Sequence, residues 1–362
     1  MPDAQDTALA EIEALSTSIW SDLSEHSGGI SWWADYEMEA ADLLDLSDYL
    51  YGVAEGIGTN LKLAETYLSE YRNKRATLDF QLRGYARTHV DEPIFHGLGT
   101  TAALKHIQLM AANVYGFFNA ATSVLDTLAG TVIGVAGLSQ PLVKADLGMF
   151  TPFASGENYP DRKQRVGKAL SGDDSARAAQ VSLVRAFRSS LEHAGPSDWH
   201  QWVNHKRNQL AHRGGRLELG TFGFGKNSWD VEHHIAFDRE PSLTTTQSFR
   251  NARVQHVESV YLLEDQQTTM EGVLGSLQAA VIGTIVPCRS LWDLRRTNPE
   301  LIHQPARQWV NPTEWIDFPG YQPNPDFYKH QDAMVVNPKD ATRLGASRIL
   351  ENTRSSNPPT RR

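Results

Sequence analysis

Apolar residues recur every three or four positions in the first part of the chain, which is the spacing of a helix that buries one face. Residues 4–26 follow this pattern at Leu9, Ile12, Leu15, Ile19 and Leu23. The same spacing predicts helices over 33–55 and 60–87. The stretch 91–100 holds one proline and two glycines, which favour a loop. The chain therefore begins with a helical region.

The second part of the chain has longer and more apolar helical segments. A helix expected over 102–137 is apolar on most sides, which indicates burial. Residues 138–174 are rich in Gly, Pro, Asp and Ser and predict a long irregular connection. Three further helices are expected over 175–193, 197–212 and 251–294.

Between the last two of these helices, the apolar residues change to alternate positions. Residues 216–224 and 229–237 alternate in this way around Gly225-Lys226-Asn227, which predicts a β-hairpin over about 216–238. The expected fold class is therefore all-α: a helical bundle with a small β-hairpin insertion and an additional N-terminal helical region.

Charge is distributed unevenly along the chain. Residues 1–61 contain thirteen Asp or Glu and no Lys or Arg, and the whole chain has a net charge of −9. A nucleic-acid partner is expected to bind the later part, because phosphates need local Lys and Arg. The acidic start is interpreted as a solvated helix face or as an acidic cover over the site. We expect an acidic helical region (1–100), a helical domain (101–296) and an irregular extension with a basic tail (297–362).

A single cysteine, Cys288, excludes an intrachain disulfide and cysteine-rich zinc sites, and fits a reducing compartment. The N-terminal stretch is acidic and amphipathic, unlike a signal peptide. The apolar stretches 113–138 and 272–286 resemble membrane spans, but the first contains Asp126 and the second is shorter than the ~20 residues that a span needs. Both are interpreted as core helices, and a cytoplasmic protein without membrane attachment is expected.

One polar run stands out on an otherwise apolar helix. Residues 204–209 are all polar or charged, and His212 falls just before two glycines that end the helix, for which Ser197 is the expected N-cap. RNA cleavage without a metal needs an acid or base that titrates near neutral pH, and a cation for the charge that develops at phosphorus. His212 supplies the imidazole. Arg207 supplies a planar guanidinium that matches phosphate oxygens.

The sequence Arg207-Asn208-x-x-x-His212 resembles the R-x4-H motif of the HEPN superfamily. Domains of this superfamily are bundles of about four helices, with the motif at the end of the third. The predicted helices have a similar order, since two precede the motif helix and a long one follows. The resemblance implies catalytic roles for Arg207 and His212 and an auxiliary polar role for Asn208. It also suggests a supporting role for Asp126, the acid on the first helix of the bundle.

The function that the resemblance implies is a metal-independent endoribonuclease of a toxin or antiviral-defence (abortive infection) system. No metal or cofactor is expected, the partners are RNA and a possible regulatory or inhibitor protein, and the product is a 2′,3′-cyclic phosphate. One His and one Arg are few for a complete site, so a homodimer that brings two motifs together is expected. The alternatives are a non-catalytic HEPN-like module that binds RNA or protein, and a helical scaffold or membrane-associated protein.

Two simpler interpretations apply to the same residues. A cation and an imidazole at a helix C-terminus favour the helix dipole without any catalysis, which would account for Arg207 and His212. The group Asp230, Glu232, His233 and His234 could suggest a metal site. However, adjacent residues of a strand point to opposite faces, so we interpret the two histidines as surface polar residues.

Overall fold

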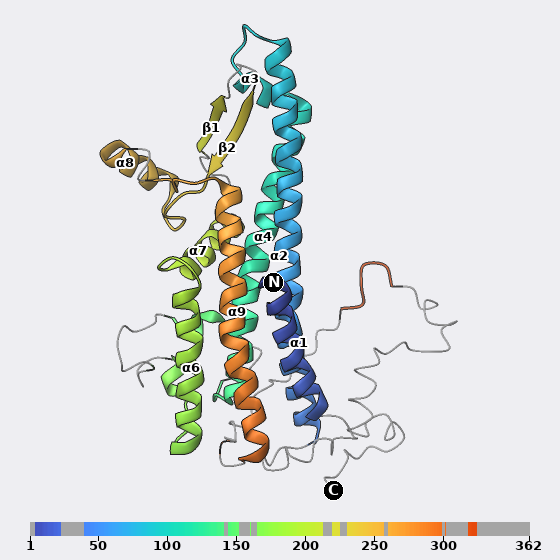
Figure 1. Cartoon of the computed structure of the whole chain (residues 1–362), viewed down its shortest axis with the longest axis vertical. Helices are drawn as coiled ribbons and strands as arrows, with labels where there is room; N and C mark the ends of the chain where they lie inside the picture. The colour runs from blue at the N-terminus through green and yellow to red at the C-terminus, as the bar shows by residue number, and fades with distance from the viewer. Residues whose placement is uncertain are drawn as a thin grey trace. The chain divides into compact units, whose positions relative to one another are not determined.

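A computed structural model describes residues 4–22, 40–140, 144–151, 160, 165–212, 219–224, 230–256, 260–298, 301 and 318–323. In these residues the chain is mainly helical with one small sheet, as the sequence predicts (Figure 1). The elements are α1 (Ala4–Asp22), α2 (Ala40–Thr88), α3 (Phe95–Leu98), α4 (Thr101–Ala136), the 3₁₀ helix η4 (Leu147–Met149), α5 (Arg165–Lys168), α6 (Asp174–Ala194), α7 (Trp199–His212), β1 (Leu219–Phe224), β2 (Val231–Ala236), α8 (Thr245–Gln255) and α9 (Gln266–Thr297).

The chain forms two compact units that alternate along the sequence. The first unit comprises Met1–Glu11, Gly56–Leu128 and Ala186–Thr284, and the second comprises Ile12–Glu55, Ala129–Arg185 and Ile285–Arg362. Helices α1, α2, α4, α6 and α9 contribute residues to both units. The regions expected from the sequence, with boundaries near residues 100 and 296, stay a prediction.

Aromatic side chains form the core of the first unit around Phe118 of α4. Its ring meets Phe117, Trp202 of α7 and Phe237 edge-on, at centroid distances of 5.3, 5.6 and 5.4 Å. Edge-to-face pairs of this kind add about 0.5–1.5 kcal/mol each beyond the burial of their area. They pack α7, the helix that carries the candidate motif, against α4 and against the residue that follows β2.

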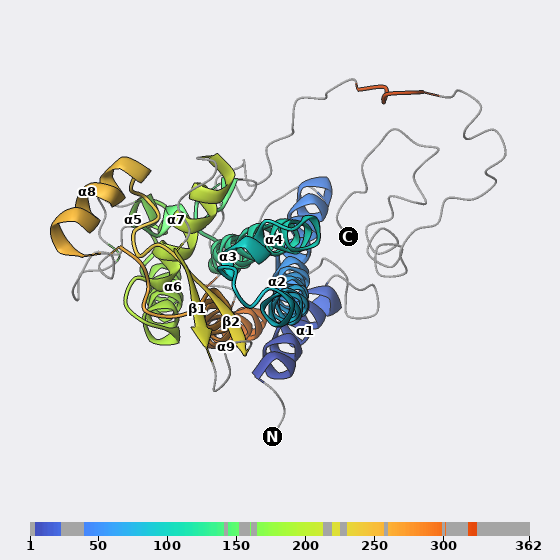
Figure 2. The ribbon, with the colours of Figure 1, turned by 90° about the horizontal axis from the view of Figure 1, so that it is seen from above.

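The two strands form the predicted antiparallel hairpin, with Leu219 opposite Ala236 and Phe224 opposite Val231. Along β2, Val231, His233 and Ile235 are buried and Glu232 is exposed, which is the period of two expected of a half-buried strand. Figure 2 shows the hairpin from above. The predicted turn at Gly225-Lys226-Asn227 lies outside the described residues.

Helix α2 is continuous where the sequence predicts a break between residues 55 and 60. Gly56 and Gly58 lie between the two predicted helices, but the buried positions keep a helical spacing through Ile57, Leu61 and Ala64. A Cβ at Gly56 would lie 3.3 Å from Cγ2 of Thr127 on α4. Gly56 therefore allows α2 and α4 to approach closely and does not end the helix.

The helix predicted over 251–294 is wrong in its first part, because α8 and α9 are separate helices. Thr244 caps α8, where its hydroxyl accepts from the Gln247 N–H and the Gln247 side chain accepts from the Thr244 N–H. Asp265 precedes α9 and accepts from the Gln267 N–H at 2.8 Å. Between the helices, Tyr261 pairs with Asp238 as an isolated antiparallel bridge. These local hydrogen bonds replace a continuous helix.

In the second unit, buried side chains donate hydrogen bonds to the carbonyl oxygens at the C-terminal end of α4. The Arg295 side chain, which is 1% exposed, donates to the carbonyl oxygens of Val135 and Ala136. Gln180 donates to the carbonyl oxygens of Ala136 and Gly137 at 3.1 and 3.0 Å. Gly137 has φ +63°, the left-handed conformation that often follows a helix. The helix therefore ends where the sequence predicts.

Among the described residues, two helices are long and apolar enough to span a membrane by length and composition. They are α4, and α9 over Gln266–Arg295. Within the apolar window of each helix, 78% and 56% of the residues are buried inside the protein. This burial agrees with the interpretation of both as core helices, and the cytoplasmic location stays a prediction.

Candidate functional site

Helix α7 carries the candidate motif and is anchored at its start. It begins at Trp199, two residues after the expected N-cap Ser197, and Asp198 between them has φ +61°. The Trp199 indole donates to the carbonyl oxygen of Leu191 at 2.9 Å, and the Trp202 indole donates to that of Asp238 at 3.3 Å. Both indoles are large apolar groups whose one polar atom is satisfied, so they hold the first turns of α7 in place.

Two residues of the polar run are structural, because Lys206 and Gln209 both bind Asp238. Lys206 Nζ lies 2.6 Å from Asp238 Oδ1 and 4.7 Å from the centroid of the Phe237 ring. The Gln209 side-chain amide donates to the other carboxylate oxygen. Burial alone would raise the pKa of Asp238, but the Lys206 ammonium and these hydrogen bonds outweigh it and lower the pKa.

The other motif residues are not engaged in this way. Arg207 and Asn208 are partly buried, and His212, the last residue of α7, is exposed. None of the three makes a hydrogen bond or ion pair with any residue that the structure describes. The two glycines predicted to end the helix, Gly214 and Gly215, lie outside the described residues. Among the described residues, the arginine and the imidazole therefore differ from Lys206 and Gln209, which are both bound to Asp238.

Arg207 and His212 leave α7 in different directions. Residues five apart on an α-helix are ~140° apart around its axis, at 100° per residue. Lys206 and Val203 mark the buried face of α7, Arg207 lies at the edge of that face and His212 on the exposed side. Within one chain the two side chains therefore diverge at their bases, and one helix does not by itself aim both at one phosphate.

Asp126, the fourth residue of the expected site, lies on α4. No described contact joins it to Arg207, Asn208 or His212. The structure therefore places three of the four expected residues on α7 and the fourth, Asp126, on α4.

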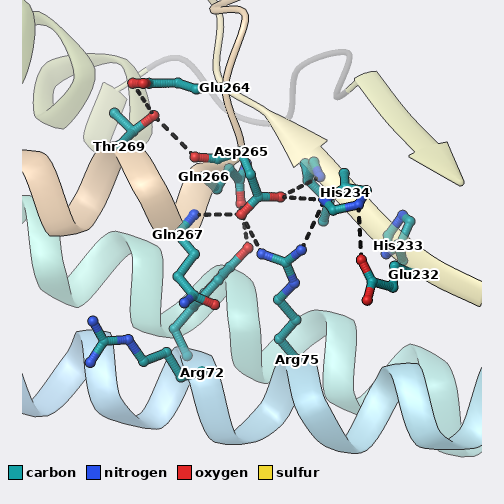
Figure 3. Close-up of polar contacts among 12 residues, drawn as sticks. Arg72, Arg75, Glu232, His233, His234, Glu264, Asp265, Gln266, Gln267 and Thr269 are labelled. Atoms are coloured by element: carbon teal, nitrogen blue, oxygen red, sulfur yellow. Dashed lines mark hydrogen bonds and ion pairs between the residues drawn. The ribbon is translucent and has the colours of Figure 1, made fainter. Parts of the chain in front are cut away.

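A second polar cluster, which the sequence did not suggest, joins α2, β2 and the start of α9 (Figure 3). Arg75 on α2 forms an ion pair with Asp265, and its Nη2 lies 3.1 Å from Nδ1 of His234. Asp265 also accepts from the Ile235 N–H at 3.2 Å. Along the same edge of β2, two residues earlier, the Asp79 carboxylate accepts from the backbone N–H of His233 at 3.2 Å.

The interpretation of His233 and His234 as surface residues is wrong for His233. Its side chain is buried and stacks on Phe222 at a centroid distance of 5.2 Å. Burial lowers the pKa of His233, and the nearby Arg75 adds to the shift. Burial also raises the pKa of Asp79. Charged partners face each other throughout this cluster, so it fixes the hairpin to α2 and α9. Within the described ranges, no group of three or more His, Cys, Asp or Glu could hold a metal ion.

A cleft of about 660 Å³ opens beside the start of α7. Its walls come from α7, from residues 239–241 and from α9, all in the first unit. The lining includes Trp202, His205, Arg239, Gly272 and Ser276. Helix α7 therefore carries the candidate motif at its end and one wall of a cleft near its start.

The comparisons with known proteins give no further assignment. No protein family, curated protein or solved structure matches the chain. The function is therefore inferred from the motif and from its surroundings. Asp238 was missed as a partner of α7 because it lies 32 residues from Lys206 in the sequence. A signal was available, since Trp199, Val203 and Lys206 have the spacing of a buried helix face, and a lysine in that series requires an acidic partner.

Proposed function

We propose that this protein is a metal-independent endoribonuclease of HEPN type that uses Arg207 and His212 to cut RNA. Its role would be in a toxin or antiviral-defence system inside the cell, under the control of a trigger or an inhibitor protein. The observation that carries the proposal is the state of Arg207. It is a partly buried guanidinium without a polar partner among the described residues, on a helix whose flanking residue Lys206 is paired.

The surroundings of Arg207 favour binding of an anion. Asp238 neutralises the adjacent Lys206, so this carboxylate is engaged by a cation other than Arg207. A guanidinium presents a planar fork of donors that fits two phosphate oxygens. Asn208, next in the chain and also partly buried, supplies an amide at the same level of the helix. A phosphodiester would satisfy the donors of both residues.

The reaction that suits these groups is attack of the ribose 2′-oxygen on the adjacent phosphorus. The new bond from the 2′-oxygen to phosphorus forms as the bond from phosphorus to the 5′-oxygen breaks, which gives a 2′,3′-cyclic phosphate and a 5′-hydroxyl end. The 2′-hydroxyl loses one proton and the leaving 5′-oxygen gains one. His212 can carry one of these protons, and Arg207 stabilises the negative charge in the transition state.

Two copies of the chain make this site complete. His212 carries one of the two protons, and water can carry the other. The ~140° between Arg207 and His212 around α7 separates them within one chain. A two-fold pair of chains would supply two imidazoles and two guanidinium groups, with Arg207 of one copy facing His212 of the other.

Cleavage of a mixed RNA pool in EDTA tests this proposal. We expect the wild-type protein to cut RNA to 2′,3′-cyclic phosphate ends, and Arg207→Ala and His212→Ala to lose at least about 100-fold in rate, the lower range for a positioned acid or base. Arg207→Lys, which keeps the charge but loses the fork, should recover only part of the rate.

Two variants serve as matched controls. His193→Ala removes an exposed histidine in the last turn of α6, and Arg87→Ala removes an exposed arginine in the last turn of α2. Both should cut like wild type. If both motif variants cut as fast as these controls, Arg207 and His212 are not catalytic.

If no form cuts RNA, arrest of cell growth on expression of wild type but not of His212→Ala would indicate an enzyme that needs a trigger. Growth unaffected by wild type would favour the binding-module alternative.

A further inference from the structure

The cleft beside α7 has the dimensions of a small-molecule site. Its volume of about 660 Å³ falls within the roughly 300–1,000 Å³ typical of ligand pockets. One wall is apolar and contains Trp202, Leu262 and Val273. Gly272 on α9 also lines the cleft, and no atom lies within 4 Å of the position that its Cβ would occupy. The cleft is therefore open next to this glycine and has an aromatic ring in its wall, which suits a flat ligand.

A hydroxyl group lines the same cleft. Ser276 is 6% exposed, and its hydroxyl makes no hydrogen bond with the part of the chain that the structure describes. This oxygen is not one of the fully buried polar atoms without a partner, so it reaches the surface of the cleft, where a ligand can donate to it or accept from it. At the rim, Asp198 has φ +61°, a conformation that residues other than glycine rarely adopt and that concentrates at functional sites.

The charges at the rim indicate which kind of ligand fits. Arg239 is exposed and makes no ion pair with a described residue, and three carboxylates, those of Asp198, Glu240 and Glu264, surround the same opening. A free anion would meet these three acids against one guanidinium, so a bare phosphate is disfavoured. A neutral heterocycle that offers both hydrogen-bond donors and acceptors can use both signs of charge.

We propose that this cleft binds an unpaired guanine base of the RNA substrate, an inference that rests on the proposed function. Guanine presents N–H donors at one edge and the acceptors O6 and N7 at another, and arginine forms a bidentate pair with O6 and N7. Arg239 matches that acceptor edge, and Glu240 or Glu264 matches the donor edge. Trp202 offers a face for stacking, as in sites that hold unpaired bases.

The position of the cleft fits a substrate that extends to the catalytic motif. His205 lines the cleft, and His212 follows it seven residues later. Seven residues are about two turns of helix, so the two imidazoles lie on the same side of α7 and about 10 Å apart along it. Roughly three stacked nucleotides cover this length, and fewer do so in an extended strand. The guanine site would thus select where the strand is cut.

Calorimetric titration with guanosine 5′-monophosphate tests the site apart from cleavage, because this probe has no phosphodiester to cut. We expect saturable binding by the wild-type full chain, and no competition from ribose 5-phosphate, which lacks the base. Gly272→Leu fills the cleft, has room for its side chain and favours the helix, so it should fold and bind at least 10-fold more weakly. Gly275→Leu is the matched control. Gly275 is exposed on the same helix, does not line the cleft and also has open space around its Cβ, so this variant should bind like wild type.

Ser276→Ala removes the hydroxyl that lines the cleft without adding volume and should weaken binding by about 3- to 10-fold, the range for one hydrogen bond. Absence of guanosine monophosphate binding, or equal binding by wild type and Gly272→Leu, would overturn the proposal. Cleavage of RNA by a protein that does not bind this probe would leave the nuclease in place and remove the guanine site. Binding of the probe by a protein that does not cut RNA would support the guanine site and remove the nuclease. If the protein both cuts RNA and binds guanosine monophosphate, Gly272→Leu should raise KM for a guanine-containing RNA at least 10-fold and leave kcat unchanged.

Discussion

Lys206 Nζ lies 2.6 Å from Asp238 Oδ1, and this ion pair fixes α7 to the residues that follow β2. Both side chains are largely buried, at 7% and 12% exposure. Arg207 is the next residue along α7 and has no such partner in the described parts of the chain. Two neighbouring cations on one helix therefore differ in their surroundings: Lys206 is paired with a buried carboxylate, and Arg207 is the one to which the proposed function assigns phosphate binding.

Asp238→Ala should destabilise the protein by about 3–5 kcal/mol, because it leaves the Lys206 ammonium buried without a counterion. Urea unfolding measures this free energy. The double variant Lys206→Met with Asp238→Ala should recover part of the loss, since no charge is then buried. Glu192→Ala is the control, because it breaks the more exposed pair with Arg188 and should cost less than about 1 kcal/mol. Equal losses from Asp238→Ala and the control would show that the buried pair contributes little.

Stability should fall as the pH is lowered below about 6.5, because burial lowers the pKa of His200 and of His233. The unfolded chain then binds more protons than the folded one, so the contribution is complete above about pH 6.5 and is lost toward the lower pKa of the folded state. The slope approaches about 1.4 kcal/mol per pH unit for each histidine. The free energy of unfolding between pH 5 and 8 measures it, and His233→Gln should reduce the slope. An equal reduction of the slope by His193→Gln, a change at an exposed histidine, would contradict the assignment to buried histidines.

Mixing Arg207→Ala with His212→Ala should restore RNA cleavage if the site takes one residue from each copy. A mixed dimer then contains one site with both groups intact and one with neither. Random exchange of chains gives about half mixed dimers, so activity should reach about a quarter of wild type. The test requires co-refolding or co-expression and a cleavage assay. If both groups come from the same chain, no mixture will regain activity.

Alanine at two glycines of α9 should change stability in opposite directions. A Cβ at Gly283 would lie 2.6 Å from Oγ and 3.0 Å from Cβ of Ser190 on α6, and that hydroxyl is held by the carbonyl oxygen of Ala186. Gly283→Ala should therefore destabilise the protein by about 1–3 kcal/mol. A Cβ at Gly275 meets open space, so Gly275→Ala should stabilise it by about 0.5–1 kcal/mol through helix propensity. Thermal unfolding of both variants distinguishes the signs, and a shared sign would contradict the close approach of α6 and α9.

The helices and the hairpin were predictable where the periodicity of the sequence is strong. Helix α4 and strand β2 agree with their expected ranges because an apolar series with one period runs through each. The break between α8 and α9 was missed because it depends on hydrogen bonds from single side chains, those of Thr244 and Asp265, rather than on a change of period. The break expected in α2 was wrong because Gly56 permits a close helix approach as readily as a turn.

The candidate site was predictable only in part. Arg207, Asn208 and His212 were expected from one short motif, and the structure places all three on α7 with the exposures of groups that can meet a ligand. The cleft was not predictable, because its walls come from segments near residues 200, 240 and 270 that only the fold brings together. The same holds for Arg75, whose partners Asp265 and His234 are distant in sequence.

Chemical labelling of the buried Cys288 thiol can measure local unfolding of the protein. It is the only cysteine of the chain, it is 0% exposed, and burial raises its pKa. A thiol-specific reagent reacts with thiolate, so modification of the folded protein is blocked twice, by access and by protonation. Labelling therefore proceeds only through molecules in which this part of α9 has opened. The labelling rate gives the frequency of that opening in native buffer, without denaturant and without an engineered probe.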